Sequence, residues 1–266
     1  MTPVFATAGG CHGRFRLWWQ LLPAALCLFP LCSVLGAAGG PDHSLFTAIL
    51  RDHVRAGAVN YRALKEDARL PQYLAMLQQT DPAVLTVRRE RLAFWLNAYN
   101  AFTLHYVISK YPVKSLMNKL AYATGGGTFK TKFITINGVK YSLNDIENDI
   151  IRPMGDPRIH LALVCGAKSC PPLRAEAYVA DRLEEQLEEQ GRLFLSQPEK
   201  NRFDFTNNEI HLSKIFDWFK DDFRKQGGSE LDFIARFLPA EQAELLRARA
   251  ATIKVKYTEY DWSLNE

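Results

Sequence analysis

The feature that most constrains the fold is a long apolar helix predicted for residues 88–111. It begins at Arg88 and ends before Pro112, because proline cannot continue a helix. Its middle, FWLNAYNAF at 94–102, is hydrophobic on nearly every face. A helix of that kind has to be covered on all sides. We therefore expect it to be the buried centre around which the other elements pack.

Two amide side chains interrupt this apolar surface. Asn97 and Asn100 are three residues apart and therefore share a face of the helix. A buried amide without hydrogen-bond partners costs on the order of 1–3 kcal/mol. The two side chains either tie the helix to a neighbouring loop or orient a catalytic group or a ligand. Both interpretations remain open at this point.

The remaining pattern predicts a single α+β domain over residues 41–266. The chain of 266 residues, 47% of them hydrophobic, is long enough for one sizeable core, and no repeat or linker divides it. Asn137-Gly138 and Asn207-Asn208 predict two hairpins. We expect the central buried helix to pack on a small, mainly antiparallel sheet. Other helices should surround it, around residues 46–54, 73–77, 143–150, 181–194, 215–223, 229–238 and 241–247.

Residues 1–38 predict a secretory signal peptide. They contain no acidic residue, and Arg14 and Arg16 precede an apolar run at 17–34 and small residues at 36–38. The alternative is an uncleaved anchor, since the run is near the lower length for spanning a bilayer, but two prolines inside it weigh against that. We expect export, with a periplasmic or secreted mature chain that has no membrane span.

Removal of the signal leaves 31 basic and 29 acidic residues, a net charge near +2. That small charge indicates neither nucleic acid nor an anionic surface as a partner. Three of the five cysteines also leave, so that Cys165 and Cys170 remain. In an oxidising compartment such a pair is first of all a disulfide candidate.

Residues 156–174 predict a candidate site. The apolar run 159–164, between an Asp-Pro pair and a glycine, indicates a buried strand with His160 inside it. The strand leads into a loop closed by two prolines, and the loop carries Cys165, Lys168 and Cys170. A rigid element that delivers reactive side chains to a loop is a common way to build a site.

Three interpretations compete for the two cysteines. A disulfide would stiffen the loop, because so small a ring removes little chain entropy. A zinc site needs about four ligands, and only His160, Cys165 and Cys170 cluster here, so we expect no metal and no cofactor. A nucleophilic cysteine needs a base and a group that orients the base. A disulfide would block that nucleophile.

Geometry favours Cys170 over Cys165 as a nucleophile. Along an extended strand, positions 160 and 165 are roughly 16 Å apart and on opposite faces. Cys170 lies beyond the turn at Gly166 and can return toward His160. For an enzyme we predict Cys170 as nucleophile, His160 as base, and Glu147 or Asn97 as the orienting group. Asn97, Asn100, Arg158 and Lys168 are the predicted substrate-binding residues, and Lys168 or a helix N-terminus would help to stabilise the thiolate.

Each candidate also has a plain structural interpretation. His160 can be a core histidine whose nitrogens are satisfied by neighbours. Glu147, in the predicted helix after Ser142, can be a solvated surface residue.

Seven blocks of sequence carry a family resemblance: GAVNY at 57–61, FWLNAYN at 94–100, LNDIE at 143–147, DPRIH at 156–160, CGAKSCP at 165–171, LSKIF at 212–216 and YDW at 260–262. In these blocks the chain resembles the domain of unknown function 547 family. The resemblance implies an exported or envelope protein and names no activity. In the family a histidine commonly follows the glutamate that matches Glu147, whereas Asn148 stands there in this chain. One candidate base is therefore absent.

Two functions from different classes fit these residues. The first is a cysteine-dependent hydrolase or acyl transferase of the cell envelope that acts on peptide or amide bonds. The second is a non-catalytic envelope binding or adaptor module for a small molecule or peptide. In the second, His160 and the asparagines would satisfy one another in a buried network away from any cleft.

Overall fold

The computed structural model describes residues 40–117, 127–225 and 228–266. Residues 38–266 form one compact unit, and its helices and small sheets confirm the α+β class. The predicted signal peptide lies outside the described residues. Within the described ranges, no helix is long and apolar enough to cross a membrane.

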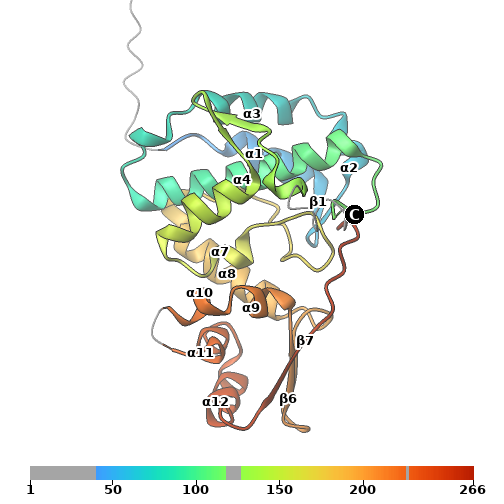
Figure 1. Cartoon of the computed structure of the whole chain (residues 1–266), viewed down its shortest axis with the longest axis vertical. Helices are drawn as coiled ribbons and strands as arrows, with labels where there is room; N and C mark the ends of the chain where they lie inside the picture. The colour runs from blue at the N-terminus through green and yellow to red at the C-terminus, as the bar shows by residue number, and fades with distance from the viewer. Residues whose placement is uncertain (1–39, 118–126, 226–227) are drawn as a thin grey trace, which may run out of the picture. The chain divides into compact units, whose positions relative to one another are not determined.

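The centre of the unit is helix α4, Arg88–Lys110, which confirms the predicted central helix. Its residues from Leu92 to Leu104 are all buried. In Figure 1 it runs beneath α3 and above α7 and α8. The elements before it are α1 (Ser44–His53), β1 (Val54–Arg55), β2 (Ala58–Val59), α2 (Tyr61–Lys65), α3 (Arg69–Gln79) and the 3-10 turn η1 (Pro82–Val84). Helices α2 and α3 pack directly on α4.

The middle of the chain is built from short elements. They are η2 (Thr128–Lys130), β3 (Ile134–Ile136), β4 (Val139–Tyr141), α6 (Leu143–Asp145), the π-helix η3 (Ile146–Ile151), η4 (Arg152–Met154) and α7 (Ile159–Ala162). Ser142 caps α6 through a reciprocal pair of hydrogen bonds with Asp145, which fixes where this helical stretch begins. The π-helix η3 then packs against α4.

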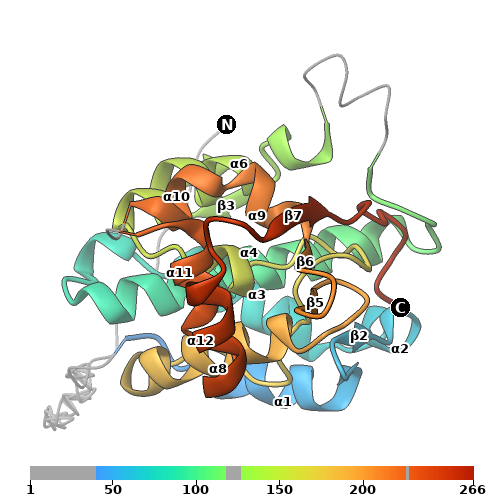
Figure 2. The same ribbon diagram turned by 90° about the horizontal axis from the view of Figure 1, so that it is seen from below.

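The last third of the chain begins in contact with α4 and continues into a three-stranded sheet and the last helices. Its elements are η5 (Ala180–Arg182), α8 (Leu183–Leu195), β5 (Arg202–Asp204), β6 (Glu209–Leu212), α9 (Lys214–Trp218), α10 (Lys220–Arg224), α11 (Glu230–Ala235), α12 (Ala240–Ala248) and β7 (Lys254–Tyr257). Strands β5 and β6 are antiparallel, and β6 pairs with β7 in parallel. Figure 2 shows β7 beside α9 and β6, with the chain running on from it to the C-terminus.

Both predicted hairpins are present. Asn137 and Gly138 have positive φ angles of 47° and 75° in the β3–β4 turn, and Asn208 has a φ of 52° in the β5–β6 turn. Asparagine and glycine tolerate that left-handed conformation, which explains why these residues signal the turns.

The buried side chains form two hydrophobic clusters, and α7 lies between them. Ile159 and Ala162 belong to the cluster around α4. Leu161 belongs to the cluster that contains β6, α9 and α11. This single helical turn therefore joins the two cores, and the residues that flank it are positioned by both.

The structure corrects one prediction: residues 159–162 form the helical turn α7, and the strand expected at 159–164 is absent. The backbone oxygens of Asp156 and Pro157 accept hydrogen bonds from the N–H groups of Ile159 and His160, which starts the turn. A short apolar run fits a buried helix as well as a buried strand, so periodicity alone could not separate them. A helical turn also satisfies its own backbone without a partner strand.

The two amides of α4 tie the central helix to later segments. Asn100 donates from Nδ2 to the oxygen of Ala162 at 3.1 Å and accepts from the N–H of Val164 at 2.9 Å. Asn97 makes the same pair of bonds with Tyr178, at 2.7 and 2.9 Å. Each amide thus satisfies a buried backbone donor and acceptor that have left regular structure.

We predict that Asn100→Leu lowers the free energy of unfolding by about 2–5 kcal/mol, because it leaves the Ala162 oxygen and the Val164 N–H buried and unpaired. Denaturant unfolding followed by circular dichroism measures the change. His105→Ala, on the exposed face of the same helix, is the control and should change stability by less than ~0.5 kcal/mol. An Asn100→Leu protein as stable as the control would contradict the proposed tie.

Candidate functional site

A cavity of about 430 Å³ lies where α4, η3, α7, the cysteine loop and the C-terminal segment meet. Its polar lining consists of Asn144, Glu147, Asn148, His160, Cys165 and Cys170. Tyr99 and several further aromatic side chains make up much of the rest. The structure thus brings Glu147, His160 and both cysteines to one cavity.

The histidine of α7 is held in one orientation. His160 is 3% exposed, and its ring stacks on Phe219 with centroids 3.8 Å apart. Its Nε2 lies 2.8 Å from Oδ2 of Asp222, while its Nδ1 is buried without a hydrogen-bond partner. Asp222, on α10, therefore orients the ring; the sequence analysis had assigned that role to Glu147 or Asn97.

Asp222 is kept ionised by its neighbours. Burial alone would raise the pKa of this carboxyl, but hydrogen bonds from Arg152, Lys225 and His160 outweigh it and hold the pKa well below the usual range. An ionised carboxylate can only accept hydrogen bonds, so Nε2 of His160 carries the hydrogen. Burial also lowers the pKa of His160 to about 4. The neutral ring therefore presents a lone pair at Nδ1.

Glu147 faces that free nitrogen. Its Oε1 is 4.0 Å from Nδ1 of His160, and its Oε2 accepts a hydrogen bond from the Tyr99 hydroxyl at 3.2 Å. Burial raises the pKa of Glu147 to about 7. When Glu147 ionises, its negative charge favours a proton on Nδ1. The two side chains thus form an acid–base pair in which Glu147 titrates near neutral pH while His160 is neutral.

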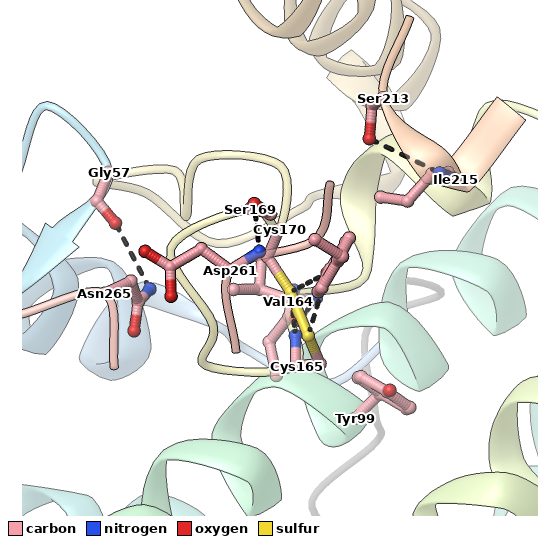
Figure 3. Close-up of a disulfide and its surroundings, with 12 residues drawn as sticks. Gly57, Tyr99, Val164, Cys165, Ser169, Cys170, Ser213, Ile215, Asp261 and Asn265 are labelled. Atoms are coloured by element: carbon pink, nitrogen blue, oxygen red, sulfur yellow. Dashed lines mark hydrogen bonds between the residues drawn. A yellow bond between two sulfur atoms is a disulfide. The ribbon is translucent and has the colours of Figure 1, made fainter. Parts of the chain in front are cut away.

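Cys165 and Cys170 are joined as a disulfide (Figure 3). The N–H of Cys165 points at Sγ of Cys170 at 3.0 Å, and the hydroxyl of Tyr260 lies 3.1 Å from that sulfur and 3.3 Å from Sγ of Cys165. Within the described residues, neither sulfur contacts His160 by a hydrogen bond. The disulfide is a wall of the cavity that contains the acid–base pair.

The C-terminal segment holds the cysteine loop in place. Backbone N–H groups of Lys168 and Ser169 donate to the oxygens of Ser263 and Asp261, at 2.8 and 3.2 Å. The Ser169 hydroxyl accepts from the N–H of Asp261 at 2.8 Å, as Figure 3 shows. The segment also carries Tyr260 into the cavity.

Gly57 supports the loop from the other side. It has a φ of +85°, and a Cβ at this position would lie 2.5 Å from Cβ of Pro172, one of the two prolines that close the loop. Glycine is required at this contact because of both the conformation and the close approach.

None of the four predicted substrate-binding residues lines the cavity. The amides of Asn97 and Asn100 are occupied by backbone groups, as described above. Arg158 is buried in an ion cluster with Asp156, Glu184 and Glu188, so its charge is neutralised inside the protein. Lys168 is exposed and borders a different surface depression, beside Tyr111 and Lys114.

The structure also contradicts the network expected for a purely structural His160. The asparagines bond to backbone, and the histidine nitrogen that they would have satisfied is unpartnered at the cavity. Asn148 lines the cavity and accepts a hydrogen bond from Arg152 at 2.7 Å. Among the residues described, no cluster of His, Cys, Asp and Glu side chains is arranged to hold a metal ion.

Two residues of the site, Asp222 and Tyr260, are not predicted from the sequence. Asp222 lies between Phe219 and Phe223 and has no local pattern of its own, and it reaches His160 across 62 positions of sequence. Tyr260 lies in the aromatic block at 260–262, which the family resemblance includes but to which no role was given. That block was the one available signal.

Comparison with known proteins finds one family model that matches part of the chain. Residues 82–195 match the model of a family described as "Protein of unknown function, DUF547". The match confirms the resemblance and covers Glu147, His160, Cys165 and Cys170, whereas Asp222 and Tyr260 lie beyond it. No curated protein and no solved structure matches the chain.

We predict that Glu147→Gln increases the free energy of unfolding more at pH 8 than at pH 5. A carboxyl whose pKa rises from 4.5 unfolded to about 7 folded binds more protons in the folded state, so the wild type loses stability as pH rises through that window. The glutamine variant lacks this loss. Its gain in unfolding free energy should be ~2 kcal/mol larger at pH 8 than at pH 5.

Denaturant melts of both proteins at the two pH values measure the difference. Glu241→Gln, at an exposed position of α12, is the matched control and should show no such dependence. Equal gains at the two pH values would show that Glu147 does not titrate in this range.

Proposed function

We propose that this member of the DUF547 family is an exported cell-envelope enzyme, a hydrolase or acyl transferase that acts on peptide or amide bonds. Cys170 is its nucleophile, and the acid–base pair His160 and Glu147 moves the proton. The observation that carries the proposal is the orientation of His160. One nitrogen is held by the ionised Asp222, and the other is free beside Glu147 in the cavity that Cys170 lines.

That arrangement matches what nucleophilic catalysis needs. A nucleophile requires a base, and the base requires a third group that fixes its tautomer and orientation. The ionised Asp222 supplies the third group, and the unpartnered Nδ1 is a base whose proton affinity rises when Glu147 ionises. Burial of an unsatisfied histidine nitrogen costs stability, so its retention favours a catalytic role over a structural one.

The chemistry begins once the disulfide has been opened. Nδ1 of His160, assisted by Glu147, takes the proton of the Cys170 thiol, and the thiolate attacks the carbonyl carbon of the amide. The proton passes to the leaving amine as the carbon–nitrogen bond breaks, which leaves an acyl group on the sulfur. Water releases it as an acid in a hydrolase, and a second amine takes it in a transferase.

The rim of the cavity favours a substrate with a flat or apolar group beside its amide. Trp218, which is 45% exposed, packs with Tyr260 and Trp262 at the cavity, with ring centroids 4.4 to 5.8 Å apart. Aromatic rings of this kind add apolar contact area at a binding site.

Two observations support export. A pair of cysteines joined as a disulfide is typical of oxidising compartments. The composition of residues 1–38 is that of a cleavable signal, which would make the domain at 41–266 the mature protein.

The alternative is a non-catalytic envelope binding or adaptor module. The observation that favours it is the disulfide itself, because a sulfur bonded to another sulfur cannot attack a substrate. In that case the aromatic rim binds a small molecule or peptide, and Glu147 and His160 provide polar contacts.

Cys165→Ser separates the two functions, because it frees Cys170 without a reductant. On a panel of peptide p-nitroanilides and thioesters, we expect this variant to be active, and the double variant with Cys170→Ala to be inactive. Adding His160→Ala or Asp222→Asn to Cys165→Ser should lower kcat by about 10²–10⁴. His211→Ala, on the β5–β6 hairpin where its partner is Glu209, is the histidine control and should leave kcat unchanged.

A second readout covers the case in which the panel lacks the substrate. At pH 7 the rate at which iodoacetamide alkylates Cys170 in Cys165→Ser should fall at least tenfold when His160→Ala is added, since the base no longer draws the thiol proton. Alkylation at an unchanged rate would favour the binding module, and turnover that persists without Cys170 would exclude Cys170 as the nucleophile.

A further inference from the structure

We infer that the Cys165–Cys170 disulfide is a reversible redox switch with a fixed polarity, which means that the same sulfur is attacked in every reduction. The thiolate of an external dithiol attacks the sulfur of Cys165, and Cys170 leaves as a thiolate that accepts a hydrogen bond from Tyr260 and is stabilised by the nearby positive charge of Lys200. The inference rests on the proposed function, in that Cys170 is taken to be the thiol that the site uses. It adds how that thiol is released and which side chains set its acidity.

Exposure indicates which sulfur is attacked. Cys170 is 3% exposed, whereas Cys165 is partly exposed at the cavity. Thiol–disulfide exchange requires the incoming thiolate to reach one sulfur while the other departs. The more accessible Cys165 is therefore the attacked sulfur, and the buried Cys170 is the leaving group.

Hydrogen-bond donors converge on the leaving sulfur. The Tyr260 hydroxyl and the N–H of Cys165 lie 3.1 and 3.0 Å from Sγ of Cys170. The hydroxyl is also 3.3 Å from Sγ of Cys165, so the backbone N–H is the donor that distinguishes the two sulfurs. Donors that point at a sulfur stabilise its thiolate and lower the pKa of the thiol. Burial raises the pKa of Tyr260, so this hydroxyl keeps its proton and remains a donor.

Lys200 adds a positive charge behind the same residue. Its Nζ donates to the backbone oxygen of Cys170 at 2.7 Å. Among the described residues, no ion pair within 4.0 Å involves this ammonium group; burial lowers the pKa of Lys200, and the more distant charge of Glu199 raises it. Lysine beside a cysteine lowers the pKa of the thiol. Lys168, which the sequence predicts for this task, borders another depression.

The acid–base pair opposes or supports the thiolate according to pH. Glu147 and His160 line the same cavity, and Glu147 is protonated below about pH 7. Above that pH its negative charge disfavours a second anion on Cys170 unless His160 has taken up the proton. Tyr99, which donates to Glu147, stays neutral because burial raises its pKa. The effects of Tyr260 and Lys200 should thus be clearest at and below neutral pH.

The exchange is balanced with a dithiol as reductant. Its first thiolate forms a bond to Cys165 sulfur, the Cys165–Cys170 bond breaks, and Cys170 keeps the electron pair. The second thiolate of the reductant then attacks the reductant sulfur that is bonded to Cys165. The bond to Cys165 breaks, the oxidised dithiol forms, and Cys165 leaves as a thiolate that takes a proton. Two electrons pass from the dithiol to the protein disulfide.

The test measures the acidity of each thiol in the fully reduced, otherwise wild-type protein. Alkylation by iodoacetamide is followed across pH 4–10, and mass spectrometry of the peptides reports each cysteine separately. We expect a lower midpoint for Cys170 than for Cys165. Tyr260→Phe and Lys200→Met should each raise the Cys170 midpoint, by on the order of one pH unit. Lys200→Arg should restore it, and Lys168→Met should have no effect.

A second measurement tests the polarity directly. The oxidised protein is mixed briefly with glutathione and quenched with acid, and the mixed disulfide should be found on Cys165 with Cys170 free. The inference would be overturned if the alkylation midpoint of Cys165 were lower than that of Cys170, or if glutathione were found on Cys170. It would also be overturned if neither Tyr260→Phe nor Lys200→Met changed the Cys170 midpoint. Neither readout needs turnover. If the predicted midpoints and mixed disulfide are found but no substrate is cleaved, the enzymatic function is rejected and the redox switch is supported. If Cys165→Ser is active but the midpoints do not shift in the variants, the enzymatic function is supported and the redox switch is rejected.

Discussion

The candidate site depends on the attachment of the central helix to the segment that follows α7. Asn100 satisfies the Ala162 oxygen and the Val164 N–H, the two backbone groups at which the helical turn changes to extended chain. An apolar side chain there would leave both groups buried and unpaired. His160 lies just before this point and Cys165 just after it, so one amide sets the positions of both. Asn97 and Asn100, which the sequence predicts as substrate-binding residues, instead bind the backbone segments that position the site.

The second core completes what the first begins. Leu161 of α7 packs among β6, α9 and α11, and α10 brings Asp222 to the far side of the imidazole ring. His160 therefore lies between Asp222 of α10 and Glu147 of η3. Three hydrogen-bond donors keep Asp222 ionised, whereas burial raises the pKa of Glu147 to about 7. The two carboxyl groups therefore play different roles. Environments that separate the pKa values of two acids are typical of acid–base sites.

The disulfide gives the site two chemical states. Oxidised, it stiffens a loop that Gly57, the two prolines and the C-terminal segment already hold. Reduced, the same loop would present Cys170 to Tyr260, Lys200 and the acid–base pair without a large rearrangement. A small ring removes little chain entropy, so the disulfide contributes more to the rigidity of the loop than to overall stability.

By itself the sequence determined the elements whose signals are local. Pro112 ends α4, asparagine and glycine mark the hairpin turns, and Ser142 caps its helix. The blocks around Glu147, His160 and the cysteines carry the family resemblance and contain most of the cavity's reactive groups. Tertiary structure alone decided that residues 159–162 are helical, that Asn97 and Asn100 bind backbone, and that Asp222, Tyr260 and Lys200 meet the site. These choices depend on partners tens of residues away, and a short apolar run or a single charged residue carries no record of which distant group will satisfy it.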